Sequence, residues 1–190
     1  MAGNTQETGA RLEGRRRGAL WAMAALALLV PLAAGWPWTM GDYVFAAVLM
    51  FGSLGLYELA ARLTGNTAYR TGAALAIAAT FLLVWVNAAV GITDSEADGL
   101  LLLLVPAVGF IGALVARFQP RGMAVVMFTA ALTVVSIAVI ALIAGIVPAF
   151  NSVFEILGIA GVFGMMFIGS GLLFHQAARQ RASVDVEASA

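Results

Sequence analysis

Long apolar runs separated by short polar breaks dominate the chain. A membrane-spanning helix needs about 20 predominantly apolar residues, and six runs approach this length. They cover roughly residues 18–34, 43–63, 72–92, 99–116, 122–147 and 153–177. The breaks, such as "TGNTAYRTG", "TDSEADG" and "RFQPRG", are short, so successive helices should pack antiparallel. The pattern predicts an all-α fold, a six-helix transmembrane bundle with short loops.

Composition supports the same class and removes several others. Hydrophobic residues make up 62% and charged residues 11%, against roughly half and a quarter in a soluble domain. The chain has no cysteine, which excludes disulfides, thiolate nucleophiles and cysteine-held iron–sulfur clusters. No continuous basic face is present, so we expect no nucleic acid partner. The expected partners are the lipid bilayer and a second copy or another membrane protein.

The placement of charge predicts an orientation. All ten basic residues are arginine, and they flank alternate breaks: Arg11, Arg15, Arg16 and Arg17, then Arg62 and Arg70, then Arg117 and Arg121, then Arg179 and Arg181. The other loops hold acidic residues instead, namely Asp42, Asp94, Glu96 and Asp98. Basic residues in short loops stay on the cytoplasmic side. This predicts a protein of the bacterial inner membrane with both termini in the cytoplasm.

The predicted organisation has three parts. Residues 1–17 form a cytoplasmic N-terminal tail, residues 18–178 a six-span transmembrane domain, and residues 179–190 a cytoplasmic C-terminal tail. An alternative concerns the first run, because Arg15–Arg17 followed by "ALWAMAALALLVPLAAG" also resembles a signal peptide. Its cleavage would leave five spans with the same sidedness.

Two polar residues inside the runs form a possible intramembrane polar site with Arg62. Glu58 stands four residues before Arg62, the favourable order for an ion pair on one helical face. Three interpretations stay open for Glu58: it is tethered to Arg62, it is a proton or cation site, since acids inside membranes are functional candidates, or it contacts another helix. Asn87 has no local partner in sequence, so it should bond to another helix or line a cavity. Glu155, three residues after Ser152, has the spacing of a capping box.

The inventory of reactive side chains argues against catalysis. His175 is the single histidine and ends the last run, where a cation complements the helix dipole. Ser170 lies in "IGSG", but Ile168 stands where intramembrane serine proteases have glycine. Ser170 and His175 are also about 140° apart around a helix, so they form no dyad. We therefore expect no enzyme activity, cofactor or metal site.

Small residues indicate where helices approach closely. Gly109 with Ala113 and Gly112 with Ala116 form small-xxx-small pairs in the fourth run. Glycines also crowd the sixth run, at Gly158, Gly161, Gly164, Gly169 and Gly171. Such positions let helix backbones come together in lipid. The fourth and sixth helices should therefore make the tightest contacts.

Three stretches between Gly41 and Ala124 carry a resemblance: "GDYVFAAVLMFGSLGLYELAARLTGNTAYRTG", "FLLVWVNAAVGI" and "ARFQPRGMA". They resemble a group of small uncharacterised multi-pass bacterial inner-membrane proteins, although "TDSEADG" is shorter than that group implies. The resemblance implies the location and the run of helices, and no site residue. The expected function is thus a non-catalytic membrane component; the alternative is a small proton- or cation-linked transporter or channel using Glu58 and Asn87.

Overall fold

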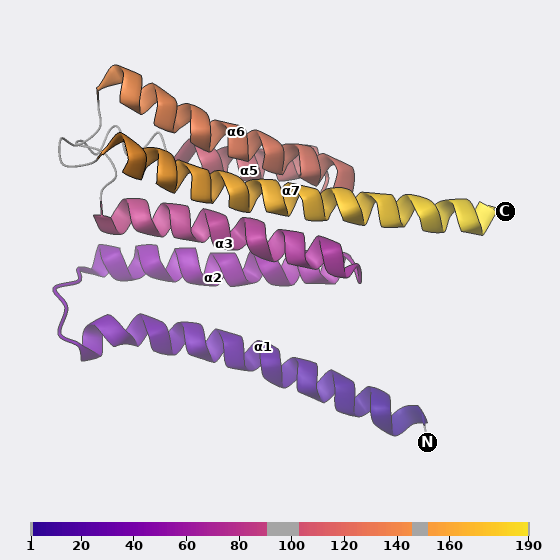
Figure 1. Ribbon diagram of the computed structural model, residues 1–190. Coiled ribbons are helices and arrows are strands. Elements are labelled where there is room, and N and C mark those ends of the chain that lie inside the picture. The colour runs from indigo at the N-terminus through magenta and orange to yellow at the C-terminus, as the bar shows by residue number, and fades with distance from the viewer. Residues whose placement is uncertain (1, 91–102, 146–151, 190) are drawn as a thin grey trace. The chain divides into compact units, whose positions relative to one another are not determined.

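The computed structural model describes residues 2–90, 103–145 and 152–189. Six α-helices make up these ranges: α1 (Ala2–Ala33), α2 (Met40–Leu63), α3 (Thr67–Val90), α5 (Leu104–Val115), α6 (Pro120–Ala144) and α7 (Val153–Ser189) (Figure 1). The predicted all-α class with six helices is confirmed. The acidic loop with Asp94, Glu96 and Asp98 lies outside the described residues.

Two helices are longer than their apolar runs. α1 begins at Ala2 rather than near residue 18, and α7 continues through residues 179–189. An apolar window detects only the part of a helix that matches lipid, whereas Ala, Arg, Glu and Gln also favour helix in a polar environment. At 1.5 Å per residue α7 is about 55 Å long, well beyond the ~30 Å of a hydrocarbon core.

Among the described residues, four helices are long and apolar enough to cross a membrane: Met40–Leu63, Thr67–Ala88, Pro120–Ala144 and Val153–Val184. Two shorter apolar helices cover Arg17–Ala33 and Leu104–Val115. With 12 residues, α5 spans about 18 Å, less than a hydrocarbon core. By length and composition, these are the helices of an integral membrane protein.

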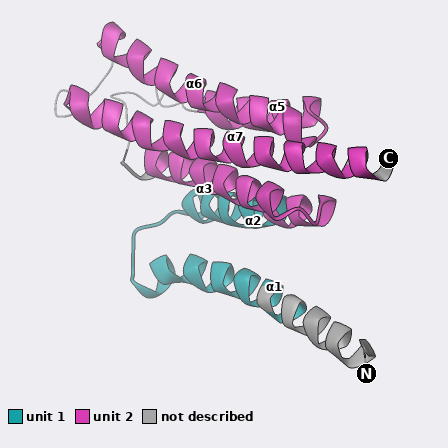
Figure 2. Ribbon diagram, turned by 45° about the vertical axis from the view of Figure 1, so that its right-hand side comes forward, with its two compact units in different colours: residues 1–56 teal, residues 57–190 magenta. Residues whose placement is uncertain are grey.

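The chain divides into two compact units, residues 1–56 and residues 57–190, with the division inside α2 (Figure 2). In the first unit Trp21 of α1 stacks on Phe51 of α2, with ring centroids 5.7 Å apart. α2 begins with a capping box. Thr39 N and Oγ1 donate to Asp42 Oδ2 at 2.7 and 2.8 Å, and Asp42 N donates to Thr39 Oγ1 at 3.3 Å. Asp42 thus has a local structural role.

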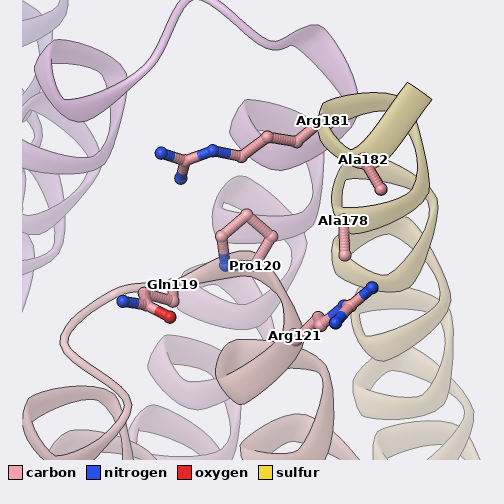
Figure 3. Close-up of a pocket in the computed structure, with 6 residues that line it drawn as sticks. All are labelled: Gln119, Pro120, Arg121, Ala178, Arg181 and Ala182. Atoms are coloured by element: carbon pink, nitrogen blue, oxygen red, sulfur yellow. The ribbon is translucent and has the colours of Figure 1, made fainter. Parts of the chain in front are cut away.

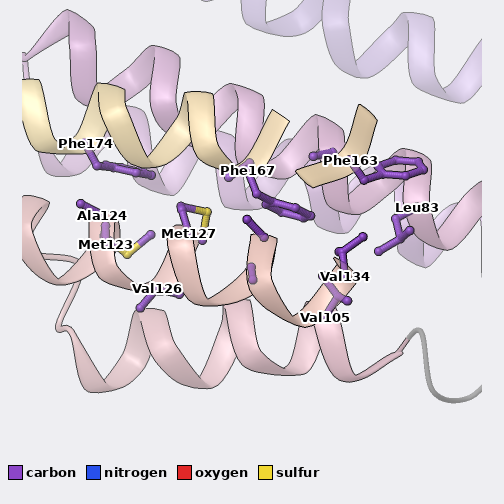
Figure 4. Packing of buried hydrophobic residues seen from close by; sticks show 14 of the residues in the cluster. Leu83, Val105, Met123, Ala124, Val126, Met127, Val134, Phe163, Phe167 and Phe174 are labelled. Carbon is purple, nitrogen blue, oxygen red and sulfur yellow. The ribbon is translucent and has the colours of Figure 1, made fainter. Parts of the chain in front are cut away.

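In the second unit, α7 packs against α3 and α6, and α5 packs against α6 (Figure 1). The core between α6 and α7 is aromatic on one side and aliphatic or thioether on the other. Phe174 and Phe167 of α7 lie near Met123 and Met127 of α6, and Phe163 lies further along, near Leu83 and Val134 (Figure 4). Phe167 and Phe174 are at most 1% exposed, so α7 is the central helix of this unit.

Small residues permit these contacts at particular points. A Cβ added at Gly112 of α5 would lie 2.7 Å from Val126, and one at Gly171 of α7 would lie 2.9 Å from Phe128. The expected close packing of the sixth helix, α7, is therefore confirmed. The fourth, α5, makes its close contact with α6, at Gly112. Gly109, Gly158 and Gly161, in contrast, face open space. The spacing of glycines therefore did not predict which of them lie against a neighbouring helix.

Candidate functional site

The expected ion pair on α2 is present. Arg62 Nη2 donates to Glu58 Oε2 at 3.3 Å, one turn along the same helix. The Arg62 side chain is 67% exposed and that of Glu58 23%. The carboxylate is therefore tethered to a guanidinium near the end of α2.

Asn87 does not join this pair. It is half-buried on α3, about 30 Å along that helix from Thr67 at 1.5 Å per residue. Glu58 and Arg62, in contrast, precede the turn that leads into Thr67. The three residues of the predicted polar site thus lie at different levels along the helices.

The other singled-out polar residues have structural contacts. Ser152 N donates to Glu155 Oε2 at 2.9 Å and Glu155 N donates to Ser152 Oγ at 3.2 Å, which confirms the capping box at the start of α7. Ser170 is fully buried, and its Oγ donates to the carbonyl of Gly72 on α3 at 2.8 Å. His175 is exposed. Within the described ranges, no group of His, Asp and Glu side chains could hold a metal ion.

A second polar cluster, which sequence reasoning missed, joins α3, α7 and the α5–α6 turn. Tyr69 is 3% exposed, and its hydroxyl donates to the carbonyl of Phe118 at 2.8 Å. Its ring meets Phe174 of α7 edge-on, with centroids 4.9 Å apart. Asn66 Nδ2 donates to Gln180 Oε1 on α7 at 2.8 Å. These contacts hold the end of α3 to both neighbours.

Asn66 also begins α3. Its Oδ1 accepts the amide of Tyr69 at 2.9 Å and its carbonyl accepts the amide of Arg70 at 3.1 Å, the arrangement of an N-cap residue. One asparagine therefore caps α3 with its carbonyl oxygen and binds α7 with its amide group. The "GNTAY" stretch signals the cap, but nothing in sequence signals Gln180 as the second partner.

The α5–α6 turn presents the Phe118 carbonyl to Tyr69 through an unusual backbone. Phe118 N donates to Ala113 O at 3.1 Å and Arg117 N donates to Leu114 O at 3.0 Å, which is a Schellman motif. Arg117 and Phe118 both have left-handed backbones, with φ of 50° and 57°. The first is the position that glycine normally takes, so the motif was invisible in "ARFQPRG". Pro120 then opens α6.

Two adjoining pockets lie where these elements meet, which we call the arginine end of the second unit. The first has a volume of about 280 Å³ and is lined by Gln119, Pro120, Arg121, Ala178, Arg181 and Ala182 (Figure 3). The second, of about 490 Å³, shares Pro120 and Arg181 with the first. Its polar lining includes Asn66, Tyr69 and Gln180, and its apolar lining includes Leu63, Phe118 and Val184. Neither Glu58 nor Asn87 lines these pockets.

No protein-family model, curated protein or solved structure matches the chain. The second unit combines two features. Its apolar core is crossed by hydrogen bonds between its own helices, and a pocket lined by two arginines lies at one end.

Proposed function

We propose that this chain is a non-catalytic, multi-pass component of the bacterial inner membrane that acts by packing against itself or a partner membrane protein. The observation that carries the proposal is how the second unit uses its polar groups. Ser170, the buried polar side chain among its described residues, donates to a backbone carbonyl, and Glu58 pairs with Arg62. The Ser170 hydroxyl thus joins α7 to α3, and the Glu58 carboxylate is neutralised within α2. Both are structural uses of a polar group.

The arginines support the proposed orientation. The turn after Arg62, the turn after Arg117 and the segment of α7 around Arg181 all contribute to the same pocket. Basic residues gathered at one end of a bundle mark its cytoplasmic side. With α7 running out of this end, the proposal places the C-terminus in the cytoplasm. The resemblance over Gly41–Ala124 supports the bacterial inner membrane as the location.

The outer face of α6 offers a surface for packing. Seven of its large apolar side chains are between 40% and 83% exposed: Val125, Phe128, Leu132, Val135, Val139, Ile140 and Ile143. In a membrane such a face contacts lipid or another helix, and helix contacts there are driven by close packing. A component that assembles through its helices needs a face of this kind.

Disulfide trapping tests the proposed assembly, because the chain has no cysteine of its own. Single cysteines at Leu132 of α6, Val115 of α5 and Leu172 of α7 all replace exposed apolar residues. If the chain packs against a second copy, the cysteine on the contacting helix should give a disulfide-linked dimer on oxidation of native membranes. The other two cysteine positions, which face lipid in that case, are the matched controls. A partner protein should instead give a stoichiometric complex that reforms from the two purified proteins. Monomers in every case, with no reconstitutable partner, would contradict the proposal.

Replacing Glu58 separates the proposal from the transporter alternative. In the proposed component, Glu58→Gln should leave expression and thermal stability nearly unchanged, because a pair with one largely exposed partner is worth at most about 1 kcal/mol. Reconstituted vesicles should show no proton or cation flux that depends on Glu58 or Asn87. A flux through the wild-type protein that Glu58→Gln abolishes while the fold persists would favour the alternative.

A further inference from the structure

The pocket in Figure 3 combines positive charge from two separate elements. Arg121 is the second residue of α6, and Arg181 is on α7, past the level at which α6 begins. Neither arginine forms an ion pair with a described carboxylate, and the lining contains no acidic residue. In Figure 3 the Arg181 side chain extends over Pro120 and the Arg121 side chain extends towards α7, so the two guanidinium groups lie on different sides of the pocket. Both side chains are exposed, so either can turn towards an anion in the pocket, and an anion held by both would relieve the repulsion between like charges.

The start of α6 adds to this field. Its N-cap residue, Gln119, makes no side-chain capping bond, and Pro120 contributes no amide. The first-turn amides of a helix have no acceptor within the helix, and its dipole favours negative charge at this end. Because Gln119, Pro120 and Arg121 all line the pocket, this partial charge adds to the two guanidinium groups.

The adjoining pocket supplies the apolar part of the site. Leu63 at the end of α2 and Val184 on α7 are 52% and 62% exposed, and both line it. It also contacts the first pocket through Pro120 and Arg181. The pockets lie where α2 ends and where α3 and α6 begin, so they lie where three of the candidate spans reach the membrane boundary. A ligand that fits is anionic at one end and apolar at the other.

We propose that this end of the second unit binds the phosphate headgroup of an anionic phospholipid, with Arg121 and Arg181 as its contacts and Leu63 and Val184 beside the first carbons of its chains. Guanidinium groups form paired hydrogen bonds with phosphate oxygens. A bound lipid would then bridge α6 and α7, and Asn66 and Gln180 would fix the adjacent wall. The inference is independent of the packing role proposed above.

The test measures lipid preference in the full-length protein. The protein is reconstituted in phosphatidylcholine vesicles that contain spin-labelled phosphatidylglycerol or spin-labelled phosphatidylcholine, and the association of each label is compared. The wild type should prefer phosphatidylglycerol, and R121Q/R181Q should lower that preference roughly fivefold. The matched control is R117Q/R179Q, which removes the same charge from exposed arginines of the same end that line neither pocket. It should keep the preference.

Three results would overturn the proposal. A wild-type protein without preference for phosphatidylglycerol contradicts it whatever the variants do. Equal losses in the two double variants would show general surface charge in place of a site. Displacement of the lipid by inorganic phosphate, beyond that caused by sodium chloride of the same ionic strength, would assign the pocket to soluble phosphate. If R121Q/R181Q does not fold, R121K/R181K keeps the charge without the paired geometry and should lose part of the preference.

Discussion

Among the described residues, the polar side chains of Asn66, Tyr69 and Ser170 make hydrogen bonds between distant elements, and Ser170 is the most buried of them. Its hydroxyl donates to Gly72 O across the α3–α7 contact, and a Cβ at Gly72 would lie 3.3 Å from Ser170 O and 3.2 Å from Leu173 Cβ. The small residue thus lets α3 come near enough for the hydrogen bond. The serine that resembled a protease motif holds two helices together.

Ser170→Ala should therefore destabilise the protein by about 0.6–1.5 kcal/mol, the range for hydrogen bonds between helices in membranes. Ser183→Ala is the control, because Ser183 is exposed and its hydroxyl bonds to Gln180 O of its own helix. Denaturant unfolding in detergent measures both changes. Equal stability of the Ser170→Ala variant and the wild type would show that the buried bond contributes nothing net.

At the scale of elements, the turn between α5 and α6 sets the geometry of the arginine end. Its Schellman motif places Arg117 at φ 50°, where a side chain costs about 1 kcal/mol or more relative to glycine. The Phe118 carbonyl is held by Tyr69 and the Phe118 ring packs against the core. These contacts of Phe118 stabilise the turn, so it forms although Arg117 has a left-handed backbone that favours glycine.

Arg117→Gly should consequently stabilise the protein, by about 0.5–1 kcal/mol once the greater freedom of glycine in the unfolded chain is counted. Arg179→Gly makes the same replacement within α7 and should destabilise by about 1 kcal/mol. Thermal unfolding of the two variants in one detergent gives the comparison. A loss of stability in both would mean that the Arg117 side chain contributes more than its backbone strain costs.

At the scale of the whole molecule, the proposed orientation predicts which loops face outward. A cysteine at Ser95, in the acidic loop, should react with an impermeant thiol reagent in intact cells. Cysteines at Gly65 and Ser183, exposed positions near the arginine end, should react only after the membrane is opened. The reason is that arginine-rich loops are not translocated. Labelling of Gly65→Cys in intact cells would show that this loop faces outward and would contradict the proposed orientation.

The sequence by itself determined the membrane helices and the local side-chain pairs, because these depend on composition and on spacings of up to one helical turn. The apolar runs specified membrane helices, since only a helix satisfies its own backbone in lipid. Glu58 with Arg62 and Ser152 with Glu155 were predictable because helix geometry brings residues three or four apart together. Asp42 belongs to the same class, since "TMGD" has the spacing of the cap it forms.

Only the tertiary structure decided the contacts between distant segments. Tyr69 reaches Phe118 across 49 residues, Gly72 meets Ser170 across 98, and Asn66 meets Gln180 across 114. The helical period shows which residues share a face, but an apolar face packs equally well against several neighbours in lipid. α7 became the central helix because Phe128 of α6 fits against its Gly171 and because its Leu173 fits against Gly72 of α3. The same packing brings Arg121 and Arg181 to one pocket.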